Sequence, residues 1–398
     1  LWRFVMELYL LDENHRRVVV LEKYISIIWA ERYKVLGDFE LHTPSTNTSR
    51  LNYAVGAHLT HRDTHRVMVI ETVEDKTDQD GRRILVVRGR SIERILLDRV
   101  AKSALVAVAD AQKWSLGPDK PADIARYVYH QICQVGILSL SDRLLDVTEG
   151  TILPASTVPE PSEDVLIALD PMTLYDALKY ILDPWDVGFR ILLAKNGTGL
   201  YFDVYSGIDR TSDQTLYPTV IFSPELENLQ NTNEFKTSAS FKNVAYVYTD
   251  GASAVVYSEG DDATTIGMNR RVLMVNATDI KDSDPPNPSA LTAALIQRGN
   301  EELAQHRKLA AFDGEVSQNS NYVYGVDYQL GDLVEMRNDD GVVNKMRVVE
   351  QIFVSDAEGE RSYPTLAINQ FVEPGTWLSW EYNSYWSDMG ANEYWSTT

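Results

Sequence analysis

The stretch RVMVIETVEDKTDQDGRRILVVRGR, residues 66–90, decides the character of the first part of the chain. Two runs of alternating, β-branched residues lie on either side of KTDQDG, which supplies the Asp and Gly residues that tight turns need. Alternation on both sides of such a turn is the signature of a β-hairpin. The sequence therefore predicts a pair of antiparallel strands here.

The same pattern continues towards the N-terminus. MELYLLDE and RRVVVLEKY flank a turn-like segment at 13–15, and SIIWAERY and GDFELHTP flank a break at 37–38. Because these segments add two further strand pairs, residues 1–105 are predicted to form a small antiparallel barrel or sandwich.

The next segment, residues 106–232, changes to a helical period. PADIARYVYHQICQVG begins with Pro121 and ends with Gly136, which are typical residues for a helix start and a helix end. Its apolar face is predicted to contain Ile124, Tyr127, Val128, Ile132 and Val135.

A second helix is predicted in DPMTLYDALKYILDPW, after a probable linker TVPEPSED. Asp170 suits the N-cap, Pro171 the first helical position, and Pro184 ends the pattern. GFRILLAKNGTGLYFDVYSG then reads as a hairpin closed near 196–197. The middle of the chain is therefore predicted to be α+β.

The third segment, residues 233–374, returns to strands. FKNVAYVYTDG, SAVVYSEG and RRVLMVNATDI precede the helical stretch SALTAALIQRGNEELAQHRKLAAF, for which Ser289 is the predicted cap. A final hairpin with its turn at 339–341 follows. This predicts a second β domain with one long helix inserted between its strands, so the fold class is α+β and mainly β.

The tripeptide Leu-Gly-Asp occurs in YKVLGDFEL (33–41) and in DYQLGDLVEM (327–336). A chain of this length repeats about ten tripeptides by chance, so the match alone indicates no duplication. Both segments are predicted to lie at a strand entrance, one in each β domain, and the two need not be equivalent positions.

Composition limits the classes of function. The net charge is -21, yet residues 1–105 hold 17 Lys and Arg against 15 Asp and Glu, so the acidity lies in the rest of the chain. Nucleic-acid binding draws its affinity from Lys and Arg, so tight DNA binding is disfavoured, whereas passage of DNA is not.

The single cysteine, Cys133, forbids an intrachain disulfide and favours assembly in the cytosol. No apolar run approaches a membrane span, and the N-terminal stretch has no signal-peptide pattern.

Three histidines, His58, His61 and His65, stand close together in HLTHRDTHR. A zinc site is disfavoured because a turn at 62–64 would point the imidazoles in different directions, so solvated loop histidines are predicted. The segment DKTDQDG would place Lys76 and Val87 at the first and twelfth positions of a calcium loop, where carboxylates are required. This segment and NDDG are both predicted to be hairpin turns. The sequence predicts no metal and no cofactor.

The common catalytic motifs are absent, including the nucleophile elbow, the phosphate loop and the zincin helix. Cys133 lies in an amphipathic stretch and is predicted to be a packing residue. A pair of carboxylates for glycoside hydrolysis stays open, because sequence does not give the distance between them. No catalytic residue is predicted, and the chain is not expected to be an enzyme.

Residues 375–398 are predicted to be an aromatic arm, which from Trp377 onward reads WLSWEYNSYWSDMGANEYWSTT, without strand or helix period. Exposed Trp and Tyr clusters are costly in water and are enriched at interfaces. The segment is predicted to be an arm that packs on its own subunit or docks on a neighbour.

The order of several motifs indicates a family. ERYKVLGDFELHTP, DPMTLYDALKYIL, YFDVYSGIDRT, VIFSPELENLQ, FKTSASFKNVAYVY and KLAAFDGEVSQNSNYVYGVDYQLGDLVEM follow one another along the chain. This succession resembles the minor tail proteins of long-tailed phages of actinobacteria, which are similar to tail-tip hubs of siphophages and contractile-tail baseplates. The resemblance extends to about Gln370 and leaves out the aromatic arm.

The resemblance implies a hub with two tail-tube-like β-barrels. Three copies would form a ring that caps the six-fold tail tube, is three-fold on its distal side and surrounds the DNA exit channel. The implied partners are two further copies, the distal tail or tube-end protein, the tape measure, and a central fibre or other minor tail proteins. The implied location is the distal end of the tail in the virion, after assembly in the host cytoplasm.

Candidate subunit contacts are the hairpin tips and the aromatic arm, because edges and hairpin arms would pair with neighbours. The candidate residues are Arg62, Asp63, His65, Asp80, Arg82, Asn338, Asp340, Trp380, Trp386 and Trp395. The alternative from another class is a carbohydrate-binding adhesin of the tail tip, with exposed Trp and Tyr stacking on sugars. A cell-wall glycan hydrolase comes third.

Overall fold

The computed structural model describes residues 6–21, 23–77, 81–103, 113–149, 164–194, 199–258, 260–278, 280, 286–306, 309–317, 322–338 and 343–368. These residues fall into two compact units. Unit 1 comprises those up to Gln230 and those from Glu315 onward, and unit 2 comprises Asn231–Gly314. The domain boundaries expected at 105, 232 and 374 stay a prediction.

Unit 1 begins with the three hairpins that the sequence predicts. Their strands are β1 (Leu8–Leu11) with β2 (Arg17–Leu21), β3 (Ser26–Arg32) with β4 (Asp38–Pro44), and β6 (Met68–Thr77) with β7 (Arg83–Ser91). A short strand, β5 (His58–His61), joins β1 to β6. Every one of these pairs is antiparallel, and alternate residues such as Phe39 and Leu41 are buried in the same apolar cluster as Trp29. The predicted hairpins are confirmed.

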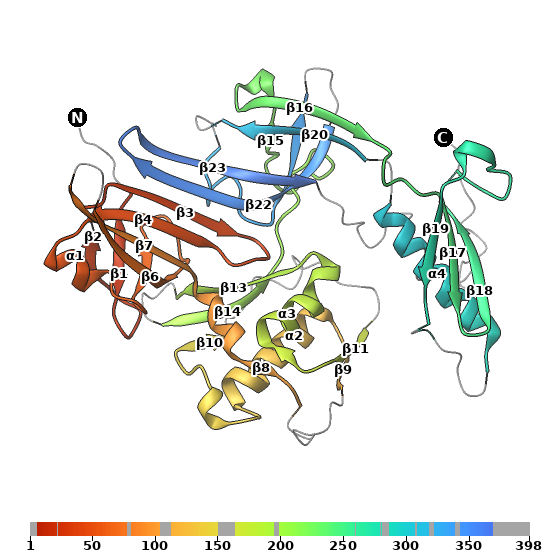
Figure 1. Cartoon of the computed structure of the whole chain (residues 1–398), viewed down its shortest axis with the longest axis horizontal. Helices are drawn as coiled ribbons and strands as arrows, with labels where there is room; N and C mark the ends of the chain where they lie inside the picture. Colours follow the sequence, from red (N-terminus) through yellow and green to blue (C-terminus); the bar gives the residue numbers. More distant parts are fainter. Residues whose placement is uncertain are drawn as a thin grey trace. The chain divides into compact units, whose positions relative to one another are not determined.

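Strands from the far end of the chain extend the same sheet. β22 (Val343–Asp356) pairs with β21 (Leu333–Arg337) through its first residues and with β3 through Glu350–Ser355, while β23 (Gly359–Ile368) pairs along β22 as well. β15 (Ile221–Phe222) adds a parallel strand beside β21. Figure 1 shows β22 and β23 running alongside β3 and β4. The pairing of β3 with β22 joins two β modules into one eleven-stranded sheet.

The fold is mainly β with some helices, 43% strand and 22% helix, as predicted. Among the described strands, the large sheet runs from β15 to β2 and no closed barrel is found. The two tube-like barrels implied by the resemblance therefore stay a prediction.

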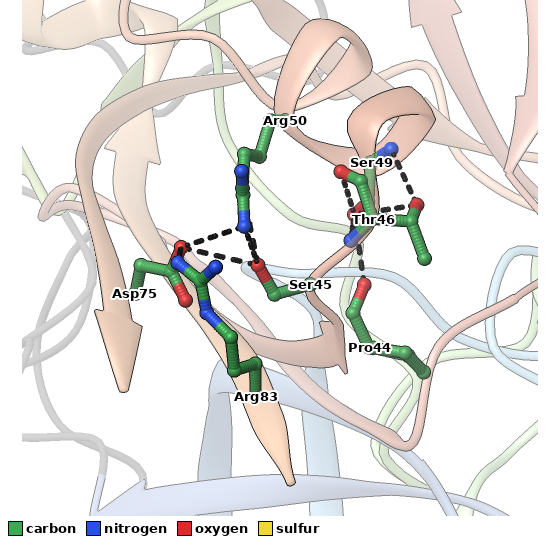
Figure 2. A network of polar contacts seen from close by, with 7 residues as sticks. All are labelled: Pro44, Ser45, Thr46, Ser49, Arg50, Asp75 and Arg83. Atoms are coloured by element: carbon green, nitrogen blue, oxygen red, sulfur yellow. Dashed lines mark hydrogen bonds and ion pairs between the residues drawn. The ribbon is translucent and has the colours of Figure 1, made fainter. Parts of the chain in front are cut away.

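Helix α1 (Asn47–Asn52) is fixed to the β6–β7 hairpin by a polar network (Figure 2). Thr46 and Ser49 form a capping box, in which the Thr46 hydroxyl accepts from the Ser49 N–H at 3.1 Å. Asp75 Oδ2 lies 3.1 Å from Arg50 Nη2 and 2.5 Å from Arg83 Nη2. The network ties the helix start to both strands of the hairpin.

The middle of unit 1 is α+β, as predicted. α2 (Pro121–Tyr129) continues through a π-helical turn, His130–Val135, and ends at Gly136 in a left-handed conformation. α3 (Leu174–Leu182) and α2 pack together and against the strands β13 (Gly188–Leu193), β14 (Leu200–Tyr205) and β10 (Val147–Glu149). β13 and β14 form the predicted hairpin, whose tip lies outside the described residues, as does nearly all of the predicted linker.

Short strands surround this core. β8 (Val100–Ala101) pairs with β12 (Met172–Thr173), and β9 (Trp114–Asp119) pairs with β11 (Val165–Leu169). A 3-10 helix, Ile92–Asp98, leads from β7 into this region. Cys133 is buried in the core, where burial raises the pKa of its thiol to about 12, in agreement with a packing role.

Two helix predictions in this region need correction. Thr173, not Asp170, caps α3, because Met172–Thr173 is held in strand β12 and the helix starts only at Leu174. Tyr127 and Val135 are half exposed instead of buried, because the buried face of α2 is centred on Ala125, Val128 and Ile132 and these two residues lie on its flank.

Unit 2 is a three-stranded sheet covered on one face by a helix. β17 (Val244–Thr249) lies between β18 (Ala252–Tyr257), which is antiparallel to it, and β19 (Val272–Asn276), which is parallel. α4 (Pro288–Gln305) packs on β17 and β18 (Figure 1). Asn287 caps α4, not Ser289, because Pro288 occupies the first helical position, and the residues predicted to end the helix form β20 (Leu309–Val316) instead. β20 pairs with β16 (Leu229–Thr237).

Two of the three clustered histidines were wrongly predicted to lie in a solvated loop. His58 and His61 are residues of β5, which pairs with β1, and His61 is fully buried against Trp29 and Phe353. The segment therefore forms a strand although most of its side chains are polar. No group of three or more metal-ligating side chains is found among the described residues.

Each Leu-Gly-Asp segment lies at a strand entrance, as predicted. Gly37 precedes β4 inside the β3–β4 hairpin, whereas Gly331 precedes β21 with a left-handed φ of +92°. A Cβ on Gly331 would lie 2.6 Å from the Tyr33 ring, so the tyrosine of the first segment packs on the glycine of the second. No helix in the described part of the chain is long and apolar enough to cross a membrane.

Candidate functional site

A cavity of about 660 Å³ opens in unit 1 where three segments meet. These are the turn between β5 and β6, the β13–β14 hairpin, and the loop before β21. Most of the lining side chains are polar or charged. They belong to Glu31, Asp63, Thr64, His65, Arg66, Arg190, Leu192, Ala194, Tyr201, Asp203, Tyr324, Gly325 and Gln329.

Arg66 is a buried residue of the cavity lining, and the cavity floor denotes Arg66 together with its ion-pair partner Glu93. Its Nη1 lies 2.9 Å from Glu93 Oε1, and its Nη2 donates to the Tyr205 hydroxyl at 2.9 Å. Burial by itself would lower the pKa of Arg66, but Tyr205, Glu93 and Glu31 outweigh burial and raise it. Glu93 Oε1 also accepts from the Ile191 N–H at 2.8 Å. This buried ion pair joins the first β module to the β13–β14 hairpin.

Glu31 is a second buried charge in the cavity wall. Its carboxylate accepts from Tyr324 Oη at 3.1 Å and from Trp29 Nε1 at 3.2 Å, and His61 Nε2 lies 3.7 Å away. Burial alone would raise the pKa of Glu31, but His61 and Arg66 outweigh burial and lower it. The carboxylate is therefore ionised at neutral pH.

Arg190 and Asp203 form a second ion pair on the β13–β14 hairpin. Asp203 Oδ2 lies 3.0 Å from Arg190 Nε and 2.9 Å from Nη2, and the guanidinium lies 3.8 Å from the Tyr205 ring centroid. Within the described residues, the buried Asp203 Oδ1 has no hydrogen-bond partner. Glu93 Oε2 and His61 Nε2 also lack a hydrogen-bond partner among the described residues.

Ion pairs and hydrogen bonds within the chain hold several polar side chains of the cavity lining. An acid-pair hydrolase needs a carboxylic acid whose pKa is raised next to one that stays ionised. Among the described carboxyl groups, burial raises the pKa of Asp332 and of Glu360, and neither lines the cavity. The two carboxyl groups whose pKa burial raises therefore lie outside the cavity lining.

Three of the candidate contact residues lie together at the cavity rim. Arg62 and Asp63 are exposed and ion-paired at 3.3 Å, and His65 follows them in the same turn. The His65 carbonyl accepts from the Leu193 N–H at 2.8 Å, so part of this turn is attached to the chain's own β13. The turn still exposes the Arg62 and Asp63 side chains to a neighbour.

The remaining candidates are separate from the cavity. Arg82 is next to the start of β7, and Asn338 directly follows β21. The other five lie outside the described residues: Asp80, Asp340, Trp380, Trp386 and Trp395.

Sequence reasoning missed the charged floor of the cavity. One signal was available, because Glu31 has the same parity as Ile27 and Trp29, which point into the sheet core from β3. A glutamate at an inward position of a strand needs a buried partner. Arg66 and Glu93 have no comparable signal, because their pairing joins a turn to a 3-10 helix.

The sequence matches one family model, described as Siphovirus ReqiPepy6 Gp37-like protein, over residues 7–366. The chain belongs to this family. It is therefore a siphovirus tail protein by family, and membership implies a location in the virion tail and contacts with other tail proteins. The resemblance inferred from the motif order is confirmed at this level. No curated protein matches the sequence significantly.

Two solved structures share the fold over nearly their whole length. The tail protein from Neisseria meningitidis is 12% identical in sequence and has a TM-score of 0.56. The match covers 94% of this chain and 99% of the Neisseria chain. The 43 kDa tail protein of prophage MuSo2 from Shewanella oneidensis is 10% identical, covers 92% and 98%, and has a TM-score of 0.58. At these identities, the two structures show that the fold is shared.

Proposed function

We propose that this tail protein is the tail-tip, or baseplate, hub of a long-tailed actinobacterial phage. Three copies would cap the tail tube at its distal end, adapt its six-fold symmetry to three-fold symmetry, and surround the channel through which DNA leaves. The observation that carries the proposal is the single sheet in which β3 and β22 join two β modules of one chain. Three chains would then present six modules to a six-fold tube.

In this arrangement, residues 1–105 supply one tube-like module and β21–β23 supply the other. The hydrogen bond from Tyr33 Oη to the Asp186 carbonyl, 2.7 Å long, attaches the α+β region between them to the first module. The ion pair of Asp186 with Arg347 of β22 attaches it to the second. The exposed Arg62, Asp63 and Arg82 side chains and Asn338 are the proposed contacts between copies. The tube-end protein, the tape measure and a central fibre are the proposed neighbours.

The acidity of the chain supports the proposed channel. A net charge of -21 disfavours adhesion of phosphates, because like charges repel across a narrow lumen. If the acids line the ring, DNA passes without binding. A ring with a basic lumen and acids on its outside would contradict this part of the proposal.

The test is the oligomeric state of the full chain, followed by a view of the assembled tail end. Native mass spectrometry is expected to show a species of three times 45.0 kDa, and electron microscopy a three-fold ring around an open channel. Asp63→Lys is expected to weaken the ring, and Asp12→Lys, in the separate β1–β2 turn, is the matched control. A protein that stays monomeric at tail-like concentrations, or a tail end without this chain in a ring, would refute the proposal.

A further inference from the structure

The sheet of unit 2 has one covered face and one open face. Helix α4 covers the face that carries Val247 and Val256, where Gly299 allows close approach because a Cβ there would lie 2.5 Å from Val256 Cγ2. Tyr246 and Tyr248 alternate with Val247 along β17, so their side chains lie on the opposite face. They are 37% and 40% exposed in a central strand.

The open face is uncharged and rich in tyrosine. The strand register places Val255 and Met274 on either side of Tyr246, and these neighbours are 49% and 65% exposed. The accessible residues of the face are Tyr246, Tyr248, Ser253, Val255, Tyr257, Val272, Met274 and Asn276, whereas Val244, of the same parity, is buried. Surfaces that become buried in protein contacts are enriched in Tyr and Met and depleted of charge. None of the residues of this face is charged, although 24% of the residues of the chain are.

One cation borders this face. The Arg270 guanidinium lies 5.8 Å from the Tyr246 ring centroid and 5.7 Å from that of Tyr257, and Nη2 donates to Tyr246 Oη at 3.0 Å. It also donates to the Thr265 carbonyl and has a side-chain hydrogen bond with Tyr257. No ion pair joins Arg270 to a carboxylate in the described part of the chain. The face therefore offers aromatic and apolar surface with an uncompensated positive charge at its edge.

The same chain contains a segment with the complementary chemistry. Residues 377–398 hold four of the eight tryptophans of the chain and three tyrosines. They also hold Glu381, Asp388 and Glu393, with no lysine or arginine. Aromatic rings fit a tyrosine face, and a carboxylate fits a fixed arginine.

We propose that residues 377–398 dock on the open face of the β18–β17–β19 sheet. In this complex, tryptophan side chains pack on Tyr246 and Tyr248, and a carboxylate of the segment pairs with Arg270. The segment belongs to the same copy or to a neighbouring one. The proposal does not depend on the hub function. A glycan or a separate tail protein on this face is the competing outcome.

Methionine oxidation of the purified full-length protein tests whether the face is covered. Met268 and Met274 both lie in unit 2 and are 97% and 65% exposed in the described structure, so Met268 is an internal control. Peptide mass spectrometry after mild peroxide treatment is expected to show Met274 oxidising several-fold more slowly than Met268. Joint replacement of Trp380, Trp386 and Trp395 by Ser is expected to remove this protection, and Arg270→Glu to reduce it roughly fivefold. Similar rates for Met268 and Met274 in the unmodified chain would overturn the proposal.

Photo-crosslinking of the full chain identifies the occupant. Tyr248→p-benzoylphenylalanine is expected to form adducts with residues 377–398, whereas Ile296→p-benzoylphenylalanine, on the exposed side of α4, is not. Mixing isotopically light and heavy protein separates adducts within one copy from adducts between copies, and both support the proposal. Adducts confined to other segments, or formed only with added cell-wall glycan, would refute it.

Discussion

Unit 1 contains a buried Arg–Glu network and an exposed one. Both have short N–O distances, and they differ in how far water reaches the side chains. In the cavity floor, Arg66 and Glu93 lie 2.9 Å apart with side chains 8% and 5% exposed. Across β4 and β7, Arg88 and Glu40 lie 2.5 Å apart with side chains 42% and 41% exposed. The exposed network continues to Glu74 at 3.5 Å. The comparison separates the effect of burial from the effect of distance.

The difference is one of solvation. Water and salt screen the exposed pair, so it contributes little even at a short distance. Both ions of the buried pair have lost their water, so removing one leaves the other uncompensated. The following changes test this contrast, from the largest expected effect to the smallest.

Replacing Arg66 by Met should have the largest effect. The change leaves the Glu93 carboxylate buried without its cation, which costs about 3–5 kcal/mol of unfolding free energy. Urea unfolding of the full chain measures the loss. The double variant Arg66→Met, Glu93→Leu should recover much of the stability, because no unpaired charge remains. A loss under about 1 kcal/mol for the single variant would mean that this pair behaves like an exposed one.

Lowering the pH should destabilise the protein through His58. Burial, together with the stacked His15 ring 5.1 Å away, lowers the pKa of His58 to about 4. Because the unfolded chain binds this proton more readily, stability is fully present above pH 6.5 and falls as the pH drops towards 4. The loss is at most about 3 kcal/mol at 1.36 kcal/mol per pKa unit.

The variant His58→Gln tests this titration, because Gln does not bind the proton. It should flatten the unfolding free energy between pH 6.5 and 4. Equal slopes for the original chain and His58→Gln would show that His58 is not held neutral by burial.

Replacing Thr46 by Ala should have an intermediate effect. The change removes the acceptor of the capping box in Figure 2 and leaves the Ser49 N–H without its partner. The expected cost is about 1 kcal/mol. Thermal unfolding measures it, and Thr46→Ser, which keeps the hydroxyl, is the control. The cap would be unimportant if Ala and Ser gave the same midpoint.

Replacing Arg88 by Met should have the smallest effect. The pair with Glu40 is exposed, so a change below about 1 kcal/mol is expected, and high salt should shrink it further. Chemical unfolding at low and high ionic strength measures both. A salt-independent loss comparable to that of Arg66→Met would break the contrast between the two networks.

The sequence predicted the hairpins because their evidence is local: an alternating run, a turn and a second run. It did not predict the β3–β22 pair, because Arg32 and Glu350 are separated by 318 residues and nothing in either strand specifies its partner. His61 was predicted to lie in a loop because the segment is rich in polar residues, and its place in a strand was overlooked. The cavity floor shares this difficulty, since Arg66 and Glu93 pair only after the sheet and the 3-10 helix have come together.

The pairing of β3 with β22 also sets an order of events during synthesis. β3 leaves the ribosome 318 residues before its partner at Glu350, which at about 5–20 residues per second is a wait of roughly 15–60 s. Throughout this time, the β3 edge presents unpaired N–H and C=O groups to the cytosol and to other nascent chains. Only the last strands close it. A chain that stops before residue 343 lacks β22, so its β3 edge stays unpaired and can pair with other chains. Completing translation therefore limits premature assembly.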